Sequence, residues 1–406
     1  MVHEKKICEI LKDVPQYKYV PEFDPDGGCI KALTLEGERV GSQKTKIFGY
    51  FGLPENISSK VPAVVLVHGG GGHAFHCWVK QWNDRGYAAI AIDTTGFMPK
   101  KRNAGCKECD GEDWERTLHG VFYEEGYVCG PDNDGMDIEE KSIEEQWMFH
   151  AVSACIKAHS FLRHQKEIDI GKIGVTGVSW GGVITSILIG MDNRFAFAVP
   201  TYGTAYLGDS FADIMQNFKK ECVKKYWMAE SRYDKLNIPV LWLAWNDDSC
   251  FSIQSASKSY LHSQSNNENS RLSLVNLMKH SHWHTWQREE PFFFADWCVK
   301  AGKAMPMITD MSSKEDICLN ITADDEIKIK SASLFYITSP MEYKVYNKFG
   351  DQSRSFMSQE WQIMPLAVEG NKAFGKMPEN AVGTYKEVVF LIGEKEITVT
   401  TEYLEK

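Results

Sequence analysis

The pentapeptide GVSWG at 177–181 constrains the fold of this chain more than any other feature. It follows an apolar run at 172–176 and precedes an apolar helical pattern at 183–191. A serine between two such glycines, at a turn from strand to helix, matches the nucleophile elbow, whose strained turn makes the serine hydroxyl project into a cleft. Side chains in place of the glycines would clash with neighbouring backbone. The motif therefore predicts a nucleophile, Ser179, and an ordinary glycine-rich turn is the alternative.

Strands and helices alternate from residue 61 to about residue 303. The apolar runs VPAVVLV at 61–67 and AAIAI at 88–92 are typical of fully buried parallel strands, and a helical pattern lies between them at 74–85. Units of this β-α-β order build a mostly parallel central sheet flanked by helices. Further strands are predicted at 172–176, 195–200, 238–245 and 272–277, and further helices at 142–163, 183–191 and 289–300.

Three parts of the chain differ in pattern and predict its domain organisation. Residues 1–60 are predicted to form an N-terminal extension with short strands, and residues 61–303 an α/β catalytic domain. Within the latter, residues 98–137 show no period and are expected to form a loop that caps the substrate site. Residues 308–406 alternate with period two and carry a hairpin signal, which predicts a small, sandwich-like all-β domain.

Charge and composition limit the expected partners and location. The net charge of −10 argues against binding to nucleic acid or to an anionic membrane surface. The sequence has no run of eighteen apolar residues and no signal-peptide pattern at its start. The eleven cysteines are odd in number and scattered, as free thiols in a reducing compartment would be. We therefore expect a cytoplasmic enzyme whose substrate is a small molecule or carbohydrate ester, and a homo-oligomer stays open.

A run of glycines provides the second element of a catalytic site. The segment HGGGG at 68–72 directly follows the first buried strand, and its glycines let backbone N–H groups approach a ligand closely. Loops of this type donate one N–H to the oxyanion of an acyl-transfer intermediate, and the residue after the nucleophile donates the other. The predicted donors are Gly70 and Trp180. A flexible turn or a phosphate cradle is the rival interpretation, but the Lys-Ser/Thr pair of a P-loop is absent.

The acid and the base are expected after the later strands, in the order serine, acid, histidine. Two carboxylates, Asp247 and Asp248, follow the strand predicted at 238–245. Asp248 is preferred, because Phe251, three residues on, can pack back against the core; Asp247 is the alternative.

Three histidines lie at 280–284, after the strand predicted at 272–277. His280 is nearest to the end of that strand and is the preferred base, and His282 is second. Two histidines spaced by two could also ligate a metal ion, but nothing else in the sequence requires one. Neither a metal nor a cofactor is therefore expected.

The predicted capping loop contains a second pattern of possible ligands. Cys106 and Cys109 have the C-x-x-C spacing of zinc sites, with His119 and Cys129 further along. The second pair lacks regular spacing, so a substrate-capping loop is preferred over a zinc site.

Several longer segments resemble a known family. The segments at 68–72, 82–93, 146–152, 173–182 and 194–200 resemble the acetyl-xylan-esterase and dienelactone-hydrolase-like branch of the α/β hydrolases, near the catalytic domain of prolyl oligopeptidases. The resemblance extends over residues 46–300. It implies the α/β-hydrolase fold and a carboxylesterase that deacetylates carbohydrate or a similar small ester.

The leading hypothesis is a serine carboxylic ester hydrolase with the triad Ser179, Asp248 and His280, working through an acyl-enzyme without a cofactor. A serine peptidase acting on small peptides or aminoacyl compounds is the alternative. A binding or scaffolding protein on an inactive hydrolase fold is a third, and it would lack a triad member. Five aromatic residues on segments that end near the cleft are expected to narrow its acyl pocket, with core packing as the alternative: Trp180, Tyr202, Trp245, Trp283 and Trp286.

Overall fold

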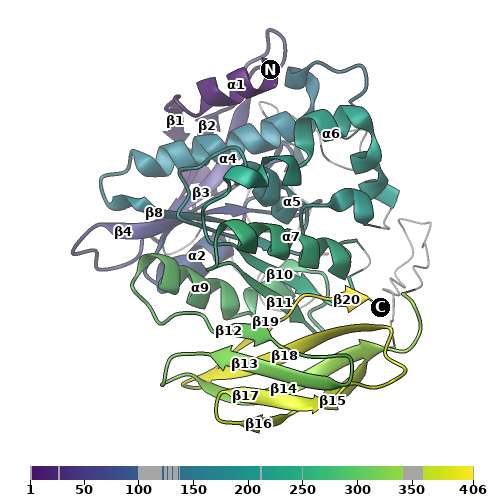
Figure 1. The fold of residues 1–406 in the computed structure, drawn as a ribbon. Coiled ribbons are helices and arrows are strands. Elements are labelled where there is room, and N and C mark those ends of the chain that lie inside the picture. The colour runs from purple at the N-terminus through teal and green to yellow at the C-terminus, as the bar shows by residue number, and fades with distance from the viewer. Residues whose placement is uncertain are drawn as a thin grey trace.

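A nine-stranded sheet forms the centre of the molecule (Figure 1). Its strand order is β1-β2-β3-β5-β4-β8-β9-β10-β11, and neighbours are parallel from β5 to β11, whereas β1, β2 and β3 are antiparallel. The predicted mostly parallel sheet is therefore confirmed. The strands are β1 (Tyr17–Tyr19), β2 (Ile30–Glu36), β3 (Lys46–Gly52), β4 (Val61–Val67), β5 (Ala88–Ile92), β8 (Ile168–Val178), β9 (Phe197–Thr201), β10 (Leu241–Trp245) and β11 (Arg271–Val275).

The computed structural model describes residues 2–25, 28–98, 121–122, 126, 130, 136, 138–210, 213–248, 250–341 and 360–405. Most of the predicted capping loop at 98–137 lies outside these residues, and so do the zinc-like Cys106, Cys109, His119 and Cys129.

The strands predicted for the N-terminal extension continue the central sheet. β3 pairs antiparallel with β5, with Gly49 opposite Ile92, and β2 pairs with β3. One sheet therefore runs across the predicted boundary at residue 60.

Helices cover both faces of the sheet, because the chain reverses its direction across it. β5 and β8 lie on opposite sides of β4 in the sheet. The connection from β4 to β5 therefore runs toward one edge of the sheet, and the connection from β5 to β8 runs toward the other edge. Because both crossovers are right-handed, α2 and α4 lie on opposite faces. α9 packs beside α2, since the ring centroids of Trp82 in α2 and Phe292 in α9 are 4.7 Å apart. The helices are α1 (Val2–Ile10), α2 (His76–Asp84), α4 (Trp147–Arg163), α5 (Trp180–Leu188), α6 (Glu221–Trp227), α7 (Ile253–Asn266), α8 (His282–Trp286) and α9 (Glu290–Val299), with 3₁₀ turns η1 (Pro21–Phe23), η4 (Ile143–Glu145), η5 (Leu207–Asp209), η6 (Asp213–Lys219) and η7 (Glu230–Lys235).

The described helices differ from the sequence-based prediction in two ways: α4 begins later than expected, and α1, α6, α7 and α8 were not predicted. The capping box of Ser142 with Glu145 is present, but it opens the short turn η4, and Gln146 is extended before α4 begins at Trp147. α7 was not predicted, because five serines among its fourteen residues blur the apolar period. Serine side chains compete with the helix backbone for hydrogen bonds, and α7 is stable because one side of it is buried.

The C-terminal part consists of two antiparallel sheets, next to the β11 end of the central sheet (Figure 1). This confirms the all-β character predicted from the period-two pattern, and the burial of β13 alternates along the strand. One sheet contains β12 (Met307–Asp310), β13 (Asp316–Thr322), β17 (Lys372–Lys376) and β16 (Ala367–Glu369); the other contains β15 (Gln362–Pro365), β14 (Lys328–Ile337), β18 (Gly383–Ile392), β19 (Lys395–Thr400) and β20 (Leu404–Glu405). A short pair, β6 (Phe97–Met98) and β7 (Val121–Phe122), lies apart from these sheets.

β11, one of the two edge strands of the central sheet, is covered by the C-terminal sheets. The Ser273 hydroxyl of β11 donates to the Thr398 carbonyl of β19 at 2.5 Å, and the Leu274 amide donates to Thr400 Oγ1 at 3.2 Å. An uncovered edge offers unpaired backbone groups to other chains, so these contacts also protect the sheet from edge-to-edge association. In the described part of the chain, no helix is long and apolar enough to cross a membrane.

Candidate active site

Ser179 lies on a strained turn between β8 and α5. Its φ of 58° and ψ of −119° fall in a region that non-glycine residues rarely adopt. The turn is anchored, since the Ser179 amide donates to the Thr201 carbonyl of β9 at 2.9 Å and the Val183 amide donates to the Ser179 carbonyl at 3.0 Å. The side chain remains half-buried rather than enclosed. This is the geometry of a nucleophile elbow.

Close backbone contacts explain the glycine at the end of the motif. A Cβ on Gly181 would lie 2.0 Å from the Val67 carbonyl oxygen and 2.6 Å from that of His68. The start of α5 therefore packs directly against the end of β4, which places the elbow beside the loop that follows β4.

Ser179, His280 and Asp248 form a continuous chain of hydrogen bonds. His280 Nε2 is 2.8 Å from Ser179 Oγ, and His280 Nδ1 is 2.7 Å from Asp248 Oδ2. The acid is enclosed, with 1% of its side chain exposed, whereas 14% of the His280 side chain is accessible. The structure thus brings together the three residues preferred from the sequence, in the arrangement of a nucleophile, a base and an orienting acid.

The acid is held by its own loop. Asp248 Oδ1 accepts hydrogen bonds from the amides of Cys250 at 2.8 Å and Phe251 at 3.1 Å, which leaves Oδ2 for His280. Phe251 is 1% exposed, so it packs into the core as predicted, and its ring is stacked 5.7 Å from that of His280.

Tyr202 is a part of the site that sequence reasoning did not assign correctly. Its ring is stacked on His280 with centroids 4.5 Å apart, and its hydroxyl donates to the Lys279 carbonyl at 2.7 Å. It follows β9 with a φ of 60°. Tyr202 therefore fixes the plane of the imidazole and the loop that carries it. The sequence signal was its place after the strand next to the elbow.

The two alternative residues lie elsewhere. The His282 ring contacts the oxyanion loop, since its Nε2 accepts from the Gly69 amide at 3.0 Å. Asp247 precedes the enclosed Asp248. Burial raises the pKa of Tyr385, and the negative charges of Glu387 and, to a smaller extent, Asp247 add to that shift. The hydrogen bonds of the triad are made by His280 and Asp248. The described residues contain no cluster of three histidine, cysteine, aspartate or glutamate side chains that could hold a metal ion.

The loop after β4 lies beside the nucleophile. A Cβ on Gly69 would be 3.1 Å from Ser179 Cβ, and Gly69 is buried whereas Gly70 is exposed. Trp180 is the first residue of α5, so its amide has no carbonyl acceptor within the helix. The amides of Gly70 and Trp180 are thus on the two segments that flank Ser179, as an oxyanion hole requires.

Most of the aromatic residues expected to line an acyl pocket are buried. Tyr202 is fully buried against His280, and Trp245 is buried in β10. Trp286 packs on Phe75 and Trp78, with ring centroids 5.5 and 5.9 Å away. The burial of these three residues favours core packing, which was the alternative expectation, and the narrow acyl pocket stays a prediction.

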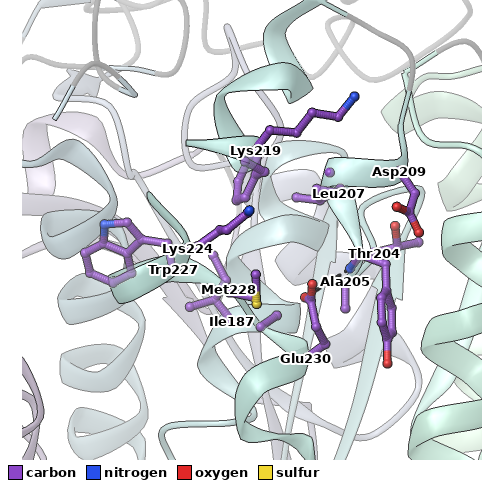
Figure 2. A pocket seen from close by; sticks show the side chains of 14 residues that line it. Ile187, Thr204, Ala205, Leu207, Asp209, Lys219, Lys224, Trp227, Met228 and Glu230 are labelled. Carbon is purple, nitrogen blue, oxygen red and sulfur yellow. Dashed lines mark hydrogen bonds between the residues drawn. The ribbon is translucent and has the colours of Figure 1, made fainter. Parts of the chain in front are cut away.

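A pocket of about 260 Å³ lies between Ile187 of α5 and the segments at 204–209 and 218–230 (Figure 2). Its apolar wall includes Ile187 of α5, Leu207 and Met228, and Lys219 and Glu230 bring opposite charges to it. Phe218, which also lines the pocket, is stacked on the Trp180 ring with centroids 6.3 Å apart. Ser179 itself does not line this pocket.

Comparisons with known proteins agree with this fold. Residues 134–299 match the model of the prolyl oligopeptidase family. Acetyl xylan esterase from Paenibacillus sp. R4 is similar in structure, with a TM-score of 0.53 and 17% identity over 73% of this chain and 94% of that one. Acetyl xylan esterase 1 from Thermoanaerobacterium sp. JW/SL YS485 has a TM-score of 0.44 and 14% identity over 68% and 85% of the two chains.

An acylaminoacyl peptidase of Pyrococcus horikoshii also matches, with a TM-score of 0.43 and 15% identity, over 66% of this chain but 40% of that one. No curated protein matches the chain in sequence. The family match includes Ser179, Asp248 and His280, and the fold is that of the α/β hydrolases. Fold and family match together support a serine hydrolase in the esterase and peptidase branch named from the sequence.

Proposed function

We propose that the protein is a carboxylic ester hydrolase that works through an acyl-enzyme on Ser179. The observation that carries the proposal is the relay from Asp248 Oδ2 to His280 Nδ1 at 2.7 Å and from His280 Nε2 to Ser179 Oγ at 2.8 Å. His280 takes the serine proton as Oγ attacks the ester carbonyl, and Asp248 holds the imidazole and stabilises its charged form. The amides of Gly70 and Trp180 stabilise the oxyanion, and water, activated by the same histidine, then releases the acid.

A small acyl group, and acetyl first, is the proposed substrate. The support is the resemblance of the sequence to acetyl-xylan esterases, together with the structural similarity to a solved esterase of that name. The carbohydrate side of the ester would lie on the open side of the site, where the exposed Gly70 and the accessible His280 are. The pocket lined by Lys219 and Glu230 is a second candidate place for part of the substrate.

Steady-state and burst kinetics test the proposal. We expect turnover of p-nitrophenyl acetate with a rapid first release of p-nitrophenol, and a mass increase of one acetyl group on the peptide that contains Ser179. Deacetylation of acetylated xylo-oligosaccharides should accompany it. Wild-type protein that hydrolyses none of these esters would refute the proposal.

A peptidase is the second candidate, because the matching family model is that of the prolyl oligopeptidases. The same panel separates the two functions when it includes aminoacyl and N-acylaminoacyl p-nitroanilides. A kcat/KM for an anilide above that for p-nitrophenyl acetate would favour the peptidase, since esters are intrinsically easier to cleave than amides.

We also propose that this activity takes place in the cytoplasm. Seven described cysteines are free thiols, and four of them, Cys155, Cys222, Cys250 and Cys298, are buried or half-buried in the core. Cys77 of α2, by contrast, is in a disulfide bond, which is unusual in a reducing compartment and argues against this location. Thiol titration of protein isolated under alkylating conditions, together with cell fractionation, would test the location.

A further inference from the structure

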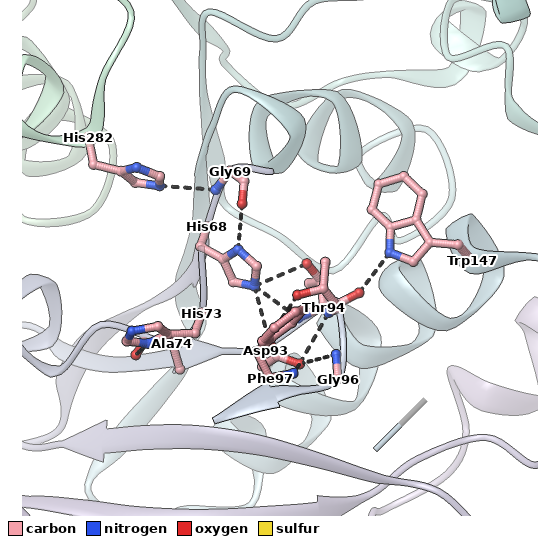
Figure 3. A network of polar contacts seen from close by, with 11 residues as sticks. His68, Gly69, His73, Ala74, Asp93, Thr94, Gly96, Phe97, Trp147 and His282 are labelled. Carbon is pink, nitrogen blue, oxygen red and sulfur yellow. Dashed lines mark hydrogen bonds and ion pairs between the residues drawn. The ribbon is translucent and has the colours of Figure 1, made fainter. Parts of the chain in front are cut away.

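Gly69 is held by a histidine at each end of its backbone (Figure 3). Its N–H donates to His282 Nε2 at 3.0 Å, and its carbonyl oxygen is 2.7 Å from His68 Nδ1. An amide nitrogen can only donate and a carbonyl oxygen can only accept, so both histidine roles are determined. His68 carries a proton on Nδ1, and His282 presents an unprotonated Nε2.

The carbonyl that His68 holds also sets the direction of the next amide. The C=O of Gly69 and the N–H of Gly70 belong to one planar trans peptide unit and point in opposite directions. The Gly72 amide donates to the same Gly69 oxygen at 3.2 Å, and Gly71 completes the turn with a φ of +70°, which glycine adopts without strain. A fixed Gly69 therefore means a fixed direction for the Gly70 N–H.

His68 is itself held in place by the loop after β5. His68 Nε2 is 3.0 Å from the Thr94 amide, and Asp93, whose Oδ1 lies 3.3 Å from the same nitrogen, accepts the amides of Gly96 and Phe97. The loop after β5 thus supports the loop after β4 (Figure 3).

The His282 ring lies among aromatic side chains. Its centroid is 5.1 Å from that of Phe75, 5.9 Å from Trp286 and 6.5 Å from Trp78. The ring is 213 residues from Gly69 in sequence but buried beside it. A buried, oriented imidazole provides an acceptor that does not move when charge develops at the reacting centre.

We infer that His282 and His68 are positioning residues that clamp the Gly69 peptide and so aim the Gly70 amide at the oxyanion. The inference rests on the proposed function, since an oxyanion forms only if Ser179 attacks an acyl group. It gives the second histidine of the HSHWH segment a role apart from that of the base. Loss of either hydrogen bond lets the Gly69–Gly70 peptide rotate, which weakens binding of the transition state more than binding of the substrate.

A matched pair of substitutions at His282 tests the clamp. His282→Phe retains a ring of similar size but has no acceptor, whereas the side-chain oxygen of His282→Gln can accept near the position of Nε2. We expect His282→Phe to lower kcat for p-nitrophenyl acetate about 10- to 100-fold with KM within about threefold, because loss of one oxyanion donor costs ~10²–10³ in kcat. His282→Gln should recover at least about tenfold of that loss.

A second pair covers the case in which a His282 variant fails to fold. In His68→Asn the amide nitrogen can donate near the position of Nδ1, and in His68→Leu no donor remains. The same split between kcat and KM is expected, with Leu the slower variant. Because both histidines hold one peptide, the combined His68→Leu and His282→Phe variant should be less impaired than the product of the single losses predicts.

The outcomes separate this inference from the proposed function. Equal kcat values for the Phe and Gln variants at 282, with both near the wild-type value or both equally low, would overturn the clamp. A purely structural role would lower the melting temperature of the Phe variant and leave the kcat of its folded fraction unchanged, which would also overturn it. Failure of the proposed function would show instead as a wild-type protein without esterase turnover or without acylation of Ser179.

Discussion

Asn246 Nδ2 donates a hydrogen bond to Tyr385 Oη at 3.0 Å, and this contact joins the loop that carries Asp248 to β18 of the C-terminal sheets. Tyr385 is fully buried, and its ring is stacked on that of Phe335 with centroids 4.8 Å apart. The C-terminal part of the chain therefore contacts and supports the loop that carries Asp248, in addition to covering the edge of β11.

Removal of this contact should affect the site more than the fold. Tyr385→Phe retains the stacked ring and deletes the hydroxyl, so we expect a loss of about 1 kcal/mol in the free energy of unfolding. The kcat should fall about three- to tenfold, because Asn246 is two residues from Asp248. Tyr336→Phe, also in the sheet of β18, is the control and should leave kcat unchanged. An unaltered kcat in Tyr385→Phe would show that the acid loop does not need this support.

Substitutions at Ser179 should separate activity from stability. Ser179→Ala and Ser179→Gly should both abolish ester turnover, since loss of a triad nucleophile costs about 10⁶ in kcat in a serine protease. Glycine adopts the φ of 58° without the strain that a Cβ causes, so Ser179→Gly should unfold at a temperature at least as high as Ser179→Ala. Calorimetry of the two variants checks this, and turnover within tenfold of wild type in either would exclude Ser179 as the nucleophile.

The two neighbouring aspartates should differ in their effect on turnover. Asp248→Asn removes the charge that faces His280 Nδ1 and should lower kcat by about 10⁴, as the equivalent change does in a serine protease. Asp247→Asn should change kcat less than about fivefold. Both variants preserve side-chain volume, so the comparison isolates the charge. The reverse order of effects would identify Asp247 as the acid and contradict the observed geometry.

Glu387 should make the stability of the protein depend on pH. Burial raises its pKa, Arg288 opposes this shift and Glu290 adds to it, and the resulting pKa is about 7, against 4.5 for an ordinary glutamate. Between these two values the unfolded chain has lost the proton and the folded chain retains it. The contribution of Glu387 to stability is therefore lost as pH rises through about 7.

A neutral substitute should remove this dependence. Glu387→Gln should raise the melting temperature relative to wild type at pH 8 and leave it about equal at pH 5. At pH 8 the free energy of unfolding of the variant should exceed that of wild type by on the order of 1–3 kcal/mol. Glu369→Gln, at an exposed position of β16, is the control and should show no such difference. Equal effects of Glu387→Gln at both pH values would exclude the raised pKa.

The local patterns of the sequence were sufficient for the parallel strands of the central sheet, for four of the eight α-helices in the described residues and for the elbow. The apolar run at 61–67 is β4, and the GVSWG motif connects β8 to α5, because strand burial and the glycine turn are properties of a few consecutive residues. α7 escaped prediction for the converse reason, since its polar sequence is helical only when one side is buried.

The partners of each side chain depend on residues far apart in the chain. Sequence reasoning preferred Asp248 and His280 but left Asp247 and His282 as alternatives. A loop has no periodic pattern from which the direction of a side chain could be predicted. The hydrogen bonds that distinguish them join residues 32, 101 and 213 positions apart, from His280 to Asp248, from His280 to Ser179 and from Gly69 to His282. The sequence by itself determined the strand-and-helix order and the nucleophile candidate, since both follow from short-range patterns. Only the tertiary structure decided that one histidine contacts the serine and the other contacts the oxyanion loop, because only the packing of β4, β8 and β11 in one sheet brings those loops together.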